Sequence, residues 1–148
     1  AKDIGVDEKL GSVIRLDTVF RNERGLPMKL ADIVADHKPM LLTLNYSGCP
    51  GLCVTQLDGL VKGLEQLSSL KAGVDFKMVS ISIDPRETPD IAAATKAKYV
   101  KMLDEKHDPK GWYFMVGDRS AIAKINPIQN NTLMIEYLML ANLESRRR

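Results

Sequence analysis

The chain has 148 residues, a length that suits one domain with a real hydrophobic core, and it carries a formal net charge of only +2. This charge balance and an aromatic content of 5% exclude an extended nucleic-acid-binding surface. No apolar run approaches the roughly 20 residues that span a bilayer, and the first residues do not resemble a signal peptide. We expect one domain over residues 1–148, either cytosolic or trimmed of a signal or anchor.

The first part of the chain predicts a hairpin, a short helix and a buried strand. Turn residues Asn22–Gly25 separate two apolar stretches and predict a β-hairpin over Leu16–Leu30. A short helix is expected over Leu30–Ala35. After Pro39, the almost wholly apolar run Met40–Tyr46 is typical of a central strand.

Helices and strands then alternate as far as Ile125. The predicted order is helix, strand, helix, strand, helix, over roughly Cys53–Leu70, Phe76–Ile83, Pro89–Asp104, Trp112–Val116 and Arg119–Ile125. This alternation predicts an α/β fold whose parallel strands are joined by crossovers, with helices covering the sheet. Beyond Ile125 the pattern weakens, and Thr132–Leu143 fits either a helix or a strand.

The two cysteines of the chain lie close together, in Cys49-Pro50-Gly51-Leu52-Cys53. A disulfide scaffold would normally have more cysteines, spread along the sequence. This motif instead follows a buried strand and opens a helix, where α/β sheets place ligand sites and where the helix dipole favours thiolates. The position predicts a redox-active dithiol or a metal site, with a static disulfide or two inert buried cysteines as the plainer alternative.

The kind of metal follows from the available ligands. Cys49 and Cys53 share a face if the end of the loop is helical, so they can hold one soft ion or close a small disulfide. Two thiolates suit Cu(I), whereas zinc requires four ligands and would need both His37 and His107, which are distant in sequence. Both histidines are interpreted as loop residues, and the scattered methionines as core filling.

Together these segments resemble the Sco/SenC family, thioredoxin-like proteins that handle copper for cytochrome c oxidase. The resembling blocks come in the family's order, at Leu10–Asp17, Phe20–Leu30, Lys38–Leu42, Tyr46–Cys53, Val79–Pro89 and Gly111–Gly117. The resemblance implies a thioredoxin-like fold with a central mixed sheet flanked by helices and with an N-terminal β-hairpin.

The resemblance also implies a function. Cys49 and Cys53 would bind copper, as Cu(I) or Cu(II), and the protein would assist assembly of the CuA site, with the copper subunit of cytochrome c oxidase as its partner. Asp84 would support this site without binding the metal itself, although an Asp-Pro turn explains it equally well. An extracytoplasmic location is implied, periplasmic or membrane-anchored, with any membrane tether outside this chain.

The alternative function is a thiol–disulfide oxidoreductase or electron-transfer protein acting on a thiol–disulfide partner. Cys49 would attack the substrate and Cys53 would resolve the mixed disulfide. The three residues between the cysteines argue mildly against this alternative, because dedicated oxidoreductases commonly have two. The two functions are compatible, since copper binds to reduced thiols.

The chain departs from the family at the third copper ligand. The family places a histidine well downstream of the cysteines, but no histidine follows His107 here, and residues 126–148 lack the family's final strands. Either a segment is absent between residues that are not contiguous in the protein, or the chain is a divergent member without this ligand. We favour the first, because a thioredoxin-like sheet needs its last hairpin.

Overall fold

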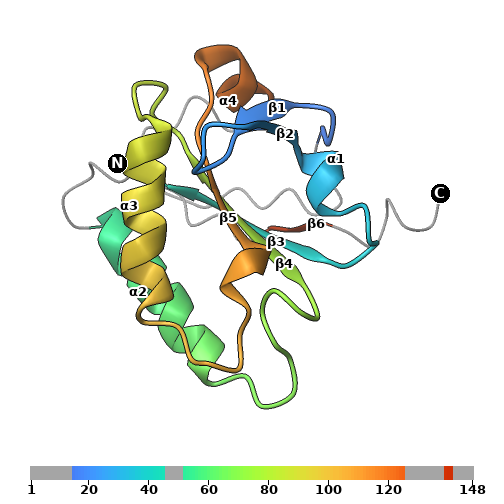
Figure 1. Cartoon of the computed structure of the whole chain (residues 1–148), viewed down its shortest axis with the longest axis vertical. Coiled ribbons are helices and arrows are strands. Elements are labelled where there is room, and N and C mark those ends of the chain that lie inside the picture. The colour runs from blue at the N-terminus through green and yellow to red at the C-terminus, as the bar shows by residue number, and fades with distance from the viewer. Residues whose placement is uncertain (1–14, 46–51, 126–138, 142–148) are drawn as a thin grey trace, which may run out of the picture.

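The computed structural model describes residues 15–45, 52–125 and 139–141 of the chain. Within these ranges Figure 1 shows helices on both sides of the central strands. In chain order the elements are β1 (Val19–Arg21), β2 (Pro27–Lys29), α1 (Leu30–Ile33), β3 (Met40–Asn45), α2 (Leu52–Glu65), β4 (Lys77–Ser82), α3 (Pro89–Val100), the 3-10 helix η1 (Pro109–Gly111), β5 (Trp112–Met115), α4 (Arg119–Ile125) and β6 (Met139–Ala141).

The central sheet is mixed, as the resemblance implies. Its strands lie in the order β5-β4-β3-β6, and a separate hairpin of β1 and β2 stands beside it. β3, β4 and β5 run parallel, whereas β6 pairs antiparallel with Met40–Leu42 of β3. The part of Thr132–Leu143 that the structure describes, Met139–Ala141, is therefore a strand.

Two hydrophobic clusters hold the layers together, one on each face of the sheet. On one face Leu30 of α1 and Ile125 of α4 pack in a cluster with Leu42 of β3. On the other face, α2 and α3 pack in a cluster with Trp112 and Phe114 of β5. β3 and β4 are covered on both faces, which explains why their sequences are nearly continuous apolar runs.

Methionines fill part of this core, as expected. Met40, Met78 and Met115 are at most 1% exposed, whereas Met102, beyond the end of α3, lies on the surface. The long, adaptable methionine side chain suits such irregular spaces between layers.

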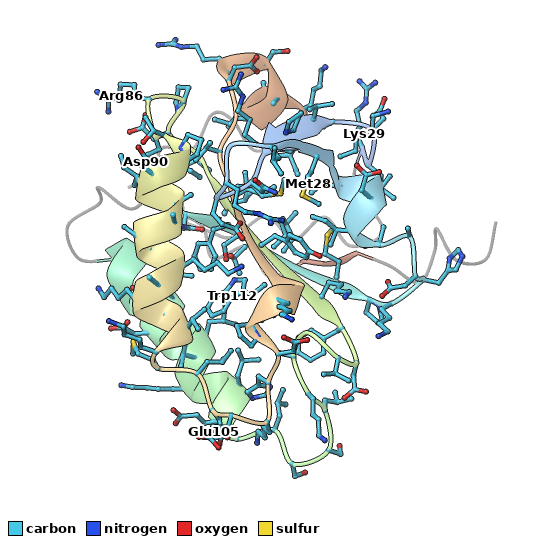
Figure 2. All side chains as sticks on the ribbon, viewed as in Figure 1. Met28, Lys29, Arg86, Asp90, Glu105 and Trp112 are labelled. Atoms are coloured by element: carbon cyan, nitrogen blue, oxygen red, sulfur yellow. The ribbon has the colours of Figure 1, made fainter. Side chains whose placement is uncertain are left out.

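Three polar side chains in the middle of the sheet are paired with one another. The hydroxyl oxygens of Thr43 and Ser80 lie 2.7 Å apart across β3 and β4. The indole Nε1–H of Trp112, the residue labelled in Figure 2, donates to the same Ser80 oxygen over 3.0 Å. This three-residue network satisfies hydroxyl and indole groups that would otherwise be costly to bury.

The predicted hairpin is fastened to the rest of the fold through its turn, Asn22–Gly25. The Glu23 carboxylate forms a 2.7 Å ion pair with Lys96 of α3, and its second oxygen accepts from the Phe114 backbone N–H at the edge of the sheet. Both side chains of the ion pair are mostly buried. The hairpin, α3 and β5 therefore meet at one partly buried charged pair.

The predicted helices are correct in place and differ in length. Thr88 caps α3, accepting the Ile91 N–H, and Pro89 is its first residue, as expected. α2 ends at Glu65 and α3 at Val100, each a few residues before the predicted end. Just beyond both ends, backbone N–H groups donate to the carbonyl oxygen three residues earlier instead of four. This 3-10 pattern is common in the last turn of a helix.

Candidate dithiol site

The motif with both cysteines lies between the carboxyl end of β3 and the start of α2. β3 ends at Asn45, and Cys53 is the second residue of α2. Cys49 falls in the segment 46–51, outside the described residues. The predicted order of strand, motif and helix is thus present in the chain, while the pairing of the two sulfurs stays a prediction.

The carboxyl ends of β3 and β4 carry polar side chains, and the motif follows β3 along the chain. Asn45 and Ser82 are register partners, and both residues are buried. The Ser82 hydroxyl accepts from the backbone N–H of Asp84 over 3.1 Å. The Asn45 Oδ1 is fully buried and has no hydrogen-bond partner among the residues that the structure describes. Two buried polar side chains therefore line the end of the sheet from which the dithiol motif continues.

Asp84 follows β4 at the same end of the sheet and is held by Arg86. Its two carboxylate oxygens accept from the Arg86 side chain, Oδ1 from Nε over 3.0 Å and Oδ2 from Nη2 over 3.1 Å. Oδ1 also accepts from the Arg86 backbone N–H. The side-chain hydrogen bonds from Arg86, followed by the backbone bond, hold the pKa of Asp84 below its usual range. Asp84 is therefore an ionised turn residue, and its predicted support of the dithiol stays a prediction.

The other end of α2 is clamped by the segment that follows α3. Lys106 Nζ donates to the backbone oxygens of Glu65 and Leu67. A cation is favourable there, because the last carbonyls of a helix carry partial negative charge. The helix that begins at the dithiol motif is thus anchored at its far end by a charged side chain.

His107 completes this clamp. Its ring is buried, with Nδ1 2.8 Å from the Ala72 backbone nitrogen and Nε2 3.1 Å from the Leu64 backbone oxygen. Nδ1 accepts and Nε2 donates, so the ring is the neutral Nε2–H tautomer. The sequence correctly placed His107 in a loop but did not reveal this role, because a histidine between lysine and aspartate resembles an ordinary surface residue.

Neither histidine is arranged as a metal ligand. Both ring nitrogens of His107 are engaged, and His37 is exposed with a left-handed backbone, at a φ of 61°. Among the side chains that the structure describes, over residues 15–45 and 57–125, no three of His, Cys, Asp or Glu gather as a metal site. The copper ligands predicted for Cys49 and Cys53 stay a prediction.

Comparison with known proteins supports the predicted resemblance. The model of the SCO1/SenC family matches residues 18–128. Comparison with curated proteins gives no significant match. In the described part of the chain, no helix is both long and apolar enough to cross a membrane.

Several solved structures share this fold. They include a protein from Aquifex aeolicus VF5, with 21% identity, a TM-score of 0.67 and coverage of 86% of this chain and 76% of that one. Yeast Sco1, solved with copper bound, has 20% identity, a TM-score of 0.58 and coverage of 83% and 73%. BsSco, from the Sco family of cytochrome c oxidase assembly proteins, has 16% identity, a TM-score of 0.57 and coverage of 86% and 70%. At these identities the similarity establishes the thioredoxin-like fold.

Proposed function

Because the chain belongs to the SCO1/SenC family, we propose that it binds copper through Cys49 and Cys53 and assists assembly of the CuA site of cytochrome c oxidase. The observation that carries this proposal is the position of the two-cysteine motif between β3 and α2. Yeast Sco1, which has the same fold, was solved with copper bound, and BsSco belongs to a family of cytochrome c oxidase assembly proteins.

The chemistry of the motif fits copper as cargo. Thiolates are soft ligands that prefer Cu(I), which accepts low coordination numbers. The partial positive charge at the start of α2 favours deprotonated sulfur, and Lys106 and His107 hold the far end of this helix in place. We therefore propose the thiolates of Cys49 and Cys53 as the sulfur ligands of Cu(I).

A titration of the reduced protein with Cu(I) against a competing chelator tests this proposal. We expect one copper ion to bind tightly to the parent and only weakly to Cys49→Ala and Cys53→Ala. The matched control is Met102→Leu, which removes an exposed sulfur that the proposal does not use. Equal retention of copper by the parent and both cysteine variants would contradict the proposal.

A second function, thiol–disulfide exchange, is favoured by one observation. BsSco, which shares the fold, has been described with a disulfide switch. In this chain the Cys49 thiolate would attack a partner disulfide and form a mixed disulfide. The Cys53 thiolate would then attack Cys49, which closes the intramolecular disulfide and leaves the partner with two thiols. Incubation of Cys53→Ser with an oxidised partner should trap the mixed disulfide, whereas Cys49→Ser should not.

The proposed partner and location follow from the same site. The partner would be the copper subunit of cytochrome c oxidase, or a thiol–disulfide protein for the second function. We propose an extracytoplasmic location, since a dithiol that cycles through a disulfide persists in oxidising compartments. Fractionation of cells that express the natural gene would test this location, and recovery in the cytosol would contradict it.

A further inference from the structure

β5 lies at one edge of the central sheet. It pairs with β4 on one side, and among the described strands none continues the sheet on the other. A strand at an edge presents backbone groups that can pair with a strand of another molecule. The segment Trp112–Val116 is a run of aromatic and apolar residues without charge or proline, a composition typical of segments that self-associate through strand pairing. An uncovered β5 would therefore be a site of self-association.

The outer edge of β5 has three backbone N–H groups that point away from β4, and each has a partner. The N–H of Trp112 donates back into η1, and the N–H of Val116 donates to a backbone oxygen of β1 over 2.9 Å. Between them, the N–H of Phe114 donates to the Glu23 carboxylate, to Oε2 over 3.4 Å. The middle of the edge is thus covered by a side chain, whereas both ends are covered by backbone.

Glu23 is held against this edge by Lys96 of α3. The second carboxylate oxygen, Oε1, forms the 2.7 Å ion pair with Lys96 Nζ, so that one carboxylate bridges α3 and β5. The Glu23 side chain is only 16% exposed, and that of Lys96 only 20%. A charged side chain directed inward at a sheet edge opposes pairing, because an incoming strand would have to displace it or bury its charge without a partner.

The hairpin turn Asn22–Gly25 carries Glu23 across the edge. Just before the turn, β1 pairs with Val116, the residue that follows β5. At the end of the turn, a Cβ on Gly25 would lie 3.9 Å from the ring of Pro89, at the start of α3. Figure 1 shows the hairpin on the side of α3 that faces α1. Another strand can therefore reach the middle of β5 only after Glu23 and this turn have moved away.

We infer that Glu23 covers the outer edge of β5 and thereby prevents two copies of this chain from pairing through that strand. The excluded partner is a second copy, because two β5 strands are identical uncharged segments that can pair across a two-fold axis. This inference goes beyond the proposed function, since it depends neither on copper binding nor on disulfide exchange.

Sedimentation velocity of Glu23→Leu tests the inference under reducing conditions, which exclude disulfide-linked copies. Leucine supplies neither the acceptor nor the charge, so we expect self-association that rises with concentration, at concentrations where the parent shows none. The control for lost stability is Leu44→Ala, which removes a buried side chain of β3, two strands away from β5. This control should sediment as the parent does. Equal self-association of both variants, or of neither, would overturn the inference.

Amide hydrogen exchange of Phe114 shows whether this edge is the one that opens. In dilute Glu23→Leu the Phe114 N–H lacks its acceptor and should exchange about tenfold faster than in the parent, for one lost hydrogen bond. Where the variant self-associates, this exchange should slow again, because the N–H pairs with the second copy. Glu23→Ala, which leaves room for water beside Lys96, gives both readouts in a second variant. Exchange at the parent's rate in both dilute variants, or exchange that association leaves unchanged, would contradict the inference.

Discussion

The clamp at the carboxyl end of α2 leads to a quantitative prediction for His107→Leu. Leucine fills a similar volume but forms no hydrogen bonds, so the Ala72 N–H and the Leu64 oxygen both lose their buried partners. Each unsatisfied group costs about 1–3 kcal/mol. Because the surface loops can relax in part, we expect the free energy of unfolding to fall by about 3 kcal/mol.

Urea denaturation followed by circular dichroism measures this loss. With a slope of about 2 kcal/mol per molar urea, the midpoint should fall by about 1.5 M while the slope stays unchanged. The control is His37→Asn, since His37 is exposed and asparagine tolerates its left-handed backbone. A loss in His107→Leu of less than about 0.5 kcal/mol, the range of ordinary surface substitutions, would refute the reasoning.

Three further predictions concern the rest of the fold. Gly73→Ala should cost more than about 2 kcal/mol, because φ is +84° and a Cβ would lie 2.1 Å from the Asp108 backbone oxygen. Gly59→Ala, in the open middle of α2, should instead stabilise by about 0.5–1 kcal/mol, and a similar loss in both variants would contradict the steric argument. His37→Gly should raise the free energy of unfolding by up to about 1 kcal/mol in the same assay, and no gain would mean that the backbone at His37 is unstrained. Arg86→Leu should raise the pKa of Asp84, followed by carboxyl NMR, since the Arg86 hydrogen bonds lower it. Because the pKa of Asp84 is lower in the folded protein, the ionised carboxylate stabilises the fold at any pH above the pKa of Asp in the unfolded chain, about 4. The difference in free energy of unfolding between the parent and Arg86→Leu should therefore vanish as the pH falls through the pKa of Asp84 in the folded protein.

The fold was largely predictable from the sequence because its signals are local. The apolar runs of β3 and β4 predict strands that are buried on both faces, and Thr88-Pro89 predicts the start of α3. The ends of α2 and α3 were less predictable, because they depend on contacts made by distant residues. Lys106 and His107 donate hydrogen bonds to backbone oxygens at the end of α2, although both lie more than 35 residues further along the chain. No local sequence pattern indicates these contacts.

The candidate site was predictable in part. The position of Cys53 in α2, after a strand that ends at Asn45, follows from periodicity and was confirmed. The bidentate contact between Asp84 and Arg86 depends on the geometry of the turn and was not anticipated. Asn45 was also missed, because an asparagine at the end of an apolar run resembles an ordinary strand terminus until its burial is known.

The central claim, a copper ion held by two thiolates of a SCO1/SenC protein, is tested most directly by X-ray absorption at the copper edge of the Cu(I)-loaded chain. The account predicts two sulfur neighbours in the parent and fewer in Cys49→Ala and Cys53→Ala, with the spectrum of Met102→Leu unchanged. A copper ion bound mainly by nitrogen or oxygen in the parent, or a spectrum that is the same in both cysteine variants, would contradict it.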